Sequence, residues 1–354
     1  AATASMFFIQ RGEILFAAIV FALSLAGATG SMTFYEALLP HIASENEMDR
    51  VSTAGYALGY VGGGILLALN LAWISNPGKF GLPSGQNLTS SQATLPARLA
   101  FVSVAIWWLV FSLPVLRKVP EPARTVEYDE LVENTSLAQS IISAFTRLGE
   151  TIRELRGYRQ AFLAMLAFTI YNDGIQTIIK MAAVYGSEIG IQQSDLITAI
   201  LLVQFIGIPF AFAFGTLAGK IGTKRSIFLG LVVYTGICIY AYNMTTTKEF
   251  YGLAMLVGLV QGGTQALSRS LFARLVPKHK SGEFFGFYSV FEKFGGILGP
   301  LLFGIALGQS GSSRIAILSV IAFFVVGGAI LATVNVKEGE AAARAADART
   351  VAVT

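Results

Sequence analysis

Residues 196–218 read LITAILLVQFIGIPFAFAFGTLA, an apolar run without a single charged side chain. A run of about 20 such residues is long enough to cross the hydrocarbon core of a bilayer as a helix. Because a membrane span must satisfy its backbone hydrogen bonds internally, each such run is expected to be helical. The sequence predicts an all-α polytopic membrane protein with nine such runs, at roughly 14–39, 51–74, 98–116, 160–185, 196–218, 225–242, 250–272, 283–308 and 313–335.

The composition of the 354-residue chain agrees with this class, since 54% of it is hydrophobic and only 13% is charged. Soluble domains carry about 25% charged residues, so an ordinary soluble enzyme and a disordered chain are excluded. Cys238 is the single cysteine, which excludes a disulfide-stapled module. The sequence has no phosphate-binding GxxxxGK[ST] loop, and its two histidines, His41 and His279, lie in predicted loops. We therefore expect no enzymatic activity, no cofactor and no metal site.

The lysines and arginines indicate the orientation. Most of the 25 fall in one set of alternate loops, which includes Arg50, the connection 117–159 and the tail 337–354. Cytoplasmic loops carry the excess of basic residues, so this set and the C-terminus are expected in the cytoplasm. The net charge of +4 is then explained by the membrane orientation and does not indicate nucleic-acid binding. Short loops favour a bacterial inner membrane, with a vacuolar membrane as the alternative.

The long connection 117–159 divides three predicted spans from six. We expect residues 1–116 to be the remainder of an N-terminal helix bundle and 160–336 to form a C-terminal six-helix bundle, with 337–354 as a cytoplasmic tail. Within the connection, apolar residues recur at helical spacing from Leu137 to Leu155. This pattern predicts an amphipathic helix on the inner membrane surface; a helix that binds a partner is the alternative.

The chain contains a weak internal repeat. The first span ends in YEALLPH at 35–41 and the seventh in FARLVPK at 272–278, and an aromatic, glycine-rich span follows each. Parallel repeats of this kind build many secondary transporters. If spans one to three correspond to seven to nine, three further spans precede residue 1, and the apolar stretch at 1–9 reads as the end of a helix. We expect this chain alone not to transport.

The fourth span carries the strongest chemical signal, TIYNDGIQTIIKMAAVYG at 169–186. Its polar residues share one helical face; they are Asn172, Asp173, Gln176 and Lys180. An ionisable group inside a span costs roughly 2.5–3.5 kcal/mol on insertion scales, so such residues normally face the protein interior or a water-filled path. A role in transport is one interpretation. A buried Asp173–Lys180 pair that only holds helices together is the other.

The seventh span repeats this pattern in LVQGGTQALSRS at 259–270, where Gln261, Gln265 and Arg269 are spaced by four. Arg269 lies about one turn from the end of the span, so it either faces the interior or extends to the interface. In the eighth span, Glu292 and Lys293 diverge by about 100° around the helix. They could form a structural ion pair or serve in coupling. Glu36, near the end of the first span, is predicted to be interfacial.

The loop GTLAGKIGTKRS at 215–226 is rich in glycine and basic residues. Its glycines let two helices approach, and its cations are expected to bind helix C-termini or acidic neighbours. The loop resembles the short basic motif of the major facilitator superfamily in its second-half position. Gly219 and Lys220 replace the usual acid and arginine, so no acid remains here for the family's gating salt bridge.

More specific stretches resemble the vacuolar amino-acid effluxer-like branch of that superfamily, which is autophagy-related in fungi and has bacterial members. They are FYEALLPHIA from Phe34, GYALGYVGGG from Gly55, YNDGIQT from Tyr171, VQGGTQALSRSLFARLVP from Val260 and EFFGFYSVFEKFGGILGP from Glu283. The resemblance implies twelve helices in two halves, of which this chain would hold helices 4 to 12. It also implies that helices 1, 4, 7 and 10 line a central cavity and that the substrate is an amino acid.

These observations favour a monomeric secondary active transporter that works in a lipid bilayer by alternating access. Polar residues of the fourth and seventh spans would contact the small-molecule substrate, with Lys180 or Arg269 binding a carboxylate and Asp173 an ammonium group. Asp173 or Glu292 could carry a coupling proton. A membrane sensor or scaffold without transport, with the 137–155 helix as its output, is the alternative hypothesis.

Overall fold

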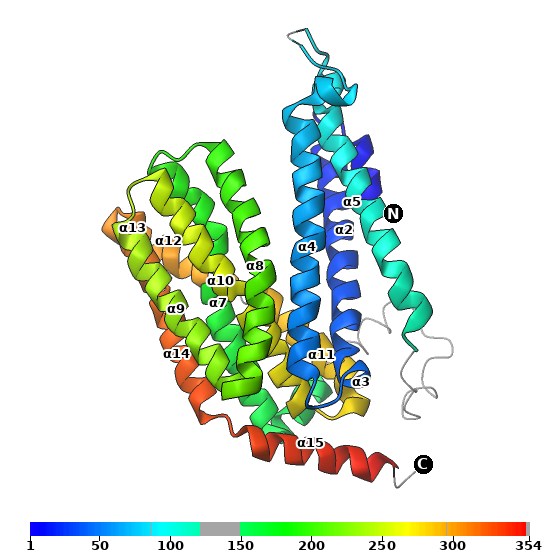
Figure 1. The fold of residues 1–354 in the computed structure, drawn as a ribbon, viewed down its shortest axis with the longest axis vertical. Coiled ribbons are helices and arrows are strands. Elements are labelled where there is room, and N and C mark those ends of the chain that lie inside the picture. The colour runs from blue at the N-terminus through cyan, green and yellow to red at the C-terminus, as the bar shows by residue number, and fades with distance from the viewer. Residues whose placement is uncertain (86, 121–148, 295, 352–354) are drawn as a thin grey trace. The chain divides into compact units, whose positions relative to one another are not determined.

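The computed structural model of the chain describes residues 1–85, 87–120, 149–294 and 296–351. Long helices dominate these residues, and no β-strand occurs among them (Figure 1). Eight helical segments are long and apolar enough to cross a membrane. Side chains on their outer faces are apolar and exposed, among them Phe212, Val232 and Val325, as expected of helices that face lipid. The predicted all-α membrane fold is confirmed.

The long helices follow the apolar runs and extend beyond most of them. They are α2 (Ile14–Ala37), α4 (Met48–Ser75), α5 (Ser90–Lys118), α7 (Arg159–Glu188), α8 (Gln193–Ile221), α9 (Thr223–Asn243) and α10 (Thr247–Leu275). Shorter helices form the last two spans, the chain ends and the continuation of α2. They are α1 (Ala2–Ser5), α3 (Leu39–Ile42), α11 (Ser281–Phe294), α12 (Leu298–Ser310), α13 (Ser313–Ser319), α14 (Ile321–Thr333) and α15 (Val336–Val351). Single 3-10 turns lie at Met6–Phe8, Pro77–Phe80 and Lys278–Lys280.

The run at 250–272 forms the full-length helix α10, but it is not among the eight segments apolar enough to span by composition. Its polar side chains lower its hydropathy. Almost all of its second half, from Gly262 to Leu275, is buried, and α10 packs mainly on α8 and α9. The polar residues of α10 therefore contact protein and not lipid, which is how membrane proteins accommodate such residues.

The run at 283–308 was predicted as one helix, and this prediction is wrong in one respect. The structure contains two helices, α11 and α12, which end and begin on either side of a short break. Gly296 lies in the break with φ +139°, a backbone conformation that only glycine adopts at low cost. The last run, 313–335, contains α13 and α14, but Val320 between them keeps helical dihedrals (φ −65°, ψ −24°), so this run has no comparable break.

The described chain forms two compact units. One contains the described residues of 1–32 and 61–120, and the other contains those of 33–60 and 149–351. In the first unit, Trp73 Nε1 donates a hydrogen bond to the Pro96 carbonyl at 3.1 Å. The core of the second unit includes stacked aromatic rings: Tyr288 of α11 lies 4.4 Å from Phe168 of α7 and 4.9 Å from Phe272 of α10, between ring centroids. The predicted division into two helix bundles stays a prediction.

The C-terminal tail forms α15, an alanine-rich helix for which the sequence analysis assigned no structure. Alanine is the strongest helix former, which accounts for a helix in so polar a segment. The predicted amphipathic helix at 137–155 lies mostly outside the described residues; of the connection's C-terminal part, residues 149–157 are described and are helical.

Candidate functional site

The polar face of α7 meets the break between α11 and α12. Asp173 is 2% exposed, and its Oδ1 accepts a hydrogen bond of 2.9 Å from the backbone N–H of Gly299, in the first turn of α12. A helix N-terminus presents unpaired N–H groups and the positive end of the helix dipole. The Asp173 carboxylate therefore caps α12 from a neighbouring helix.

Lys180 holds the other side of the break. Its Nζ donates a hydrogen bond of 3.0 Å to the carbonyl of Gly296, a backbone group that the interrupted helix leaves without its usual partner. No ion pair joins Asp173 to Lys180; the two side chains, both within the described residues, bind the backbone of the break instead. The direct Asp173–Lys180 ion pair, which was the alternative to a role in transport, is therefore absent.

The other two predicted residues of α7 differ in their surroundings. Asn172 is fully buried, and neither atom of its amide group has a hydrogen-bond partner, whereas Gln176 is half-buried. A buried amide without partners is unfavourable. The unpaired Asn172 amide is therefore available to a polar group that enters the protein.

Arg269 is buried at 4% exposure and does not extend to an interface. Its guanidinium donates from Nε to Ser52 Oγ at 3.0 Å and from Nη2 to the Ser52 carbonyl at 3.2 Å. The same group lies 5.0 Å from the ring centroid of Tyr56 and 5.7 Å from that of Tyr35. These hydrogen bonds and cation–π contacts stabilise a cation that would be costly to bury alone.

The prediction that Glu36 is interfacial is wrong. Glu36 is only 5% exposed, and it interacts electrostatically with Glu292, Arg269 and Lys293. Its Oε2 atom is buried without a hydrogen-bond partner. The sequence could not reveal these neighbours, because Glu292, Arg269 and Lys293 lie more than two hundred positions along the chain.

Glu292 and Lys293 point to different surroundings, as their adjacent positions on α11 predict. The Glu292 side chain is 20% exposed and the Lys293 side chain 56%, with 3.8 Å between Oε1 and Nζ. Gln261 and Gln265 on α10 are half-buried. The structure thus places Glu292 with Arg269 and Glu36 in one cluster, whereas Asp173 and Lys180 meet at the helix break.

The two sets lie on helices that are directly connected. The Tyr171 and Ser268 hydroxyls are 2.5 Å apart, which joins α7 to α10 inside the core. Among the described residues no hydrogen bond or ion pair links Asp173 or Lys180 to Arg269. The predicted residues therefore form two neighbouring polar groups and not one.

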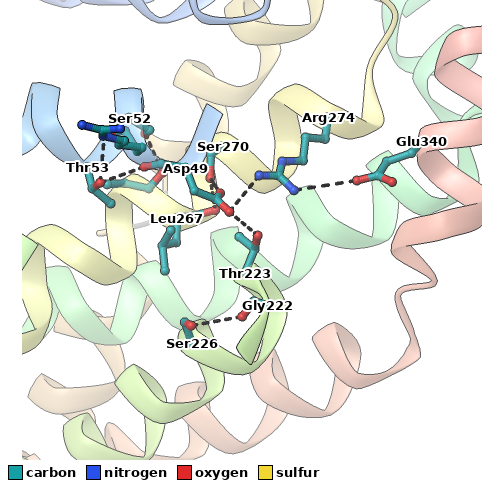
Figure 2. Close-up of polar contacts among 12 residues, drawn as sticks. Asp49, Ser52, Thr53, Gly222, Thr223, Ser226, Leu267, Ser270, Arg274 and Glu340 are labelled. Atoms are coloured by element: carbon teal, nitrogen blue, oxygen red, sulfur yellow. Dashed lines mark hydrogen bonds and ion pairs between the residues drawn. The ribbon is translucent and has the colours of Figure 1, made fainter. Parts of the chain in front are cut away.

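A third polar group was missed by the sequence analysis. Asp49, in the first turn of α4, is 7% exposed and forms an ion pair of 2.8 Å with Arg274 of α10 (Figure 2). Thr223 Oγ1 donates to Asp49 Oδ2 at 2.6 Å, and Ser270 Oγ donates to Oδ1 at 2.5 Å. Arg274 also reaches Glu340 of α15 at 3.9 Å. We call Asp49, Thr223, Ser270 and Arg274 the Asp49 cluster.

The basic loop before α9 contributes to this region. Gly222 has φ +92°, which lets α8 turn directly into α9 and places Thr223 beside Asp49. The expectation that its cations bind helix C-termini is confirmed for Lys224, whose Nζ donates to the carbonyls of Ala332 at 2.8 Å and Val334 at 2.7 Å, at the end of α14. Cations stabilise this end of a helix dipole.

Helix α15 binds several segments near the Asp49 cluster. Arg344 pairs with Glu45 at 2.8 Å. Asp347 accepts from the Lys278 backbone N–H at 2.9 Å and lies 2.8 Å from His279 Nδ1. The N-terminal side of α15 is held by Gln160, whose Oε1 accepts from the Asn335 backbone N–H at 2.8 Å. The C-terminal helix is therefore fastened to α7, to the end of α10 and to the segment before α4.

A bundle of lipid-facing helices that buries ionisable side chains beside a broken helix defines a polytopic protein of the transporter class. Its fold is similar to that of FucP, a major facilitator superfamily transporter whose crystal structure is in the outward conformation. The TM-score is 0.67 at 13% sequence identity, and the similarity covers 94% of this chain and 82% of FucP. The predicted bundle of the major facilitator type is confirmed.

Residues 1–344 match the family described as "Vacuole effluxer Atg22 like", and the chain belongs to this family. The family is a branch of the major facilitator superfamily, whose members are transporters and not enzymes. It is 38% identical to the uncharacterized MFS-type transporter YxiO of Bacillus subtilis, over 94% of this chain and 74% of YxiO. It is 28% identical to autophagy-related protein 22 of Yarrowia lipolytica, over 76% of this chain. The chain matches 47% of the length of that fungal relative.

Proposed function

We propose that the protein is a secondary active transporter that moves a small solute, an amino acid, across a membrane by alternating access. The observation that carries the proposal is the break between α11 and α12, where Asp173 binds the first turn of α12 and Lys180 binds the Gly296 carbonyl within the break. Transporters commonly form their sites at discontinuous helices, where backbone groups and helix ends become available to solutes and ions. Two ionisable side chains at such a break support a path for a charged or zwitterionic solute.

The solute would contact both polar groups. An ammonium group suits the Asp173 carboxylate, and a carboxylate suits Lys180 or Arg269. Binding would replace existing bonds, since Lys180 now donates to Gly296 and Arg269 to Ser52. The unpaired amide of Asn172 supports a further contact, and the half-buried Gln176, Gln261 and Gln265 complete the set. Glu292 and Lys293 are proposed to serve in coupling to a proton.

We further propose a monomer in a bacterial cell membrane with the C-terminus in the cytoplasm. The bacterial relative YxiO and the short loops support the membrane, and the basic residues of alternate loops support the orientation. In this orientation the Asp49 cluster and α15 lie on the cytoplasmic side. Labelling of single cysteines with a membrane-impermeant reagent in intact cells tests it: a cysteine at Lys337 should stay unlabelled, and one at Lys79 should react.

Counterflow in proteoliposomes tests the transport function. The full-length protein is reconstituted, the liposomes are loaded with unlabelled leucine, lysine or glutamate, and uptake of the same labelled amino acid is followed. The Asp173→Asn, Lys180→Met double variant should lose exchange, because it removes both charges that hold the break. Lys79→Met is the matched control, since Lys79 lies in an exposed turn. It should exchange at the wild-type rate.

Two results would count against the proposal. Full exchange by the double variant would remove Asp173 and Lys180 from the transport path. Absence of exchange for all three probes, with wild-type protein that is folded and correctly inserted, would contradict amino-acid transport.

A further inference from the structure

We propose that Glu36 and Glu292 together form a proton-binding site, in which the two carboxyl groups share one proton beside Arg269. This inference rests on the proposed transport function and assigns the coupling proton to a residue that the sequence analysis placed at the interface. The proton would form one O–H bond to a carboxylate oxygen when it enters from one side of the membrane. It would return to water on the other side, and no other bond would form or break.

The burial of Glu36 is the first observation. The side chain is 5% exposed, and its Oε2 atom has no hydrogen-bond partner. A buried carboxylate oxygen without a partner is costly, because it has lost its water and gained nothing in exchange. A proton on one of the two oxygens removes the charge and creates a donor. Glu36 therefore lies where a bound proton relieves an existing cost.

The charges around Glu36 are the second observation. The titratable groups within electrostatic reach of Glu36 are Glu292, Lys293 and Tyr288 from α11, Arg269 from α10, and Tyr56 from α4. Lys293 is 56% exposed and lies 3.8 Å from Glu292, which leaves Arg269 as the buried cation among these groups. Two carboxylates beside one buried cation favour the uptake of a single proton, because like charges in one site are not easily ionised together.

The hydrogen bonds of Arg269 distinguish this site from a structural salt bridge. Its Nε and Nη2 atoms donate to Ser52, and no ion pair joins Arg269 to either carboxylate among the described residues. A structural pair would form direct bonds that fix the charge on the carboxylate. Here Glu292 forms one ion pair, of 3.8 Å, with the exposed Lys293, and Glu36 forms none among the described residues. A carboxyl group beside the fixed charge of Arg269 can therefore gain or lose a proton.

The position of the site would couple the proton to movement. Tyr35, the neighbour of Glu36 in the sequence, lies with Tyr56 against the Arg269 guanidinium. A change in the charge of Glu36 changes its attraction to Arg269, and hence the contact between residues 35–56 and α10. This contact joins two segments far apart in the sequence, as a step that links proton binding to alternating access requires.

Infrared difference spectroscopy of the purified full-length protein measures the proton directly. On a change from high pH to about pH 6, at which exposed carboxylates stay ionised, the wild-type protein should show the carbonyl band of a protonated carboxyl group. Glu36→Gln and Glu292→Gln should each abolish this band, because the proton is shared. Glu47→Gln, which changes an exposed carboxylate of the segment before α4, should leave the band unchanged. An unchanged band in folded Glu36→Gln protein would overturn the proposal. If that variant does not fold, the half-buried Glu292 gives the same test.

Transport separates this inference from the proposed function. In Glu36→Gln proteoliposomes, counterflow of the probe amino acid should continue, since exchange requires no net movement of a proton. Accumulation of the amino acid driven by an imposed pH gradient should fall to the level of protein-free liposomes. Uphill accumulation at the wild-type level would overturn the inference and leave transport standing. Loss of the infrared band in a protein that exchanges none of the probes would contradict transport and leave the proton site standing.

Discussion

The structural roles of single polar side chains in this protein depend on partners that are distant in sequence. Asp49 receives an ion pair and two hydroxyl donors from positions between 174 and 225 residues away. Nothing near Asp49 in the sequence distinguishes it from any acidic residue in the first turn of a helix, where the helix dipole alone favours it. Asp173 and Arg269 could be predicted, because a charge inside an apolar run is conspicuous by itself. The position of Asp49 at the end of a run concealed it.

Removal of the Asp49 charge should destabilise the protein. In Asp49→Asn, Arg274 loses its partly buried partner, and a hydrogen bond between charged groups is worth about 1.5–3 kcal/mol. A lower melting temperature of the purified protein is the expected result. Glu45→Gln breaks the ion pair with Arg344, whose side chains are 44% and 56% exposed. Such pairs contribute about 0–1 kcal/mol, so this control should melt close to the wild type. Equal effects of the two substitutions would contradict the role assigned to Asp49.

At the scale of helices, the sequence predicted the number and position of the apolar runs but not the interruption of one of them. Hydropathy measures length and apolarity, and both are unchanged when a helix breaks at a glycine. The break is recognisable only from its partners, because the carboxylate of Asp173 and the ammonium group of Lys180 satisfy the backbone atoms that it exposes. The same residues were conspicuous in the sequence, yet their actual partners are backbone groups, which no side-chain pattern reveals.

The contact between α7 and α12 should depend on a glycine. A Cβ atom added to Gly299 would overlap Thr177 Oγ1 and crowd Asp173, so Gly299→Ala should cost about 1–3 kcal/mol by overpacking. Gly304 lies on the same helix with open space around it. Gly304→Ala should be neutral or stabilising by about 0.5–1 kcal/mol, since alanine favours a helix. Melting temperatures of the two variants check this difference. A Gly299→Ala protein as stable as Gly304→Ala would show that the two helices separate easily.

At the scale of the whole chain, the low content of charged residues and the motifs predicted the class and the family correctly. It did not reveal that the C-terminal segment is a helix fastened to the rest of the second unit. The bonds of α15 reach Arg274, Lys278 and Glu45. They join surface positions whose side chains are ordinary in any polar tail, so only the folded arrangement identifies them as partners.

Removal of α15 should loosen the segments that it binds. Deletion of residues 336–354 leaves Arg274 without Glu340 and the Lys278 N–H without Asp347. Faster hydrogen exchange is expected in residues 274–281, because local opening depends on such contacts. Lys337→Gln, which changes an exposed side chain of the same helix, should leave the exchange rate unchanged. Unaltered exchange after the deletion would show that α15 does not stabilise this region.

The Asp49 cluster also has a consequence for biosynthesis. Arg274 lies 225 residues after Asp49, and chains are synthesised at about 5–20 residues per second, so Asp49 precedes its ion-pair partner by roughly 10–45 s. During that interval several helices must enter the membrane while the carboxylate relies on water and on its own helix N-terminus. The contacts of the Asp49 cluster therefore form late in biosynthesis, and they can form only after α10 has been synthesised and correctly inserted.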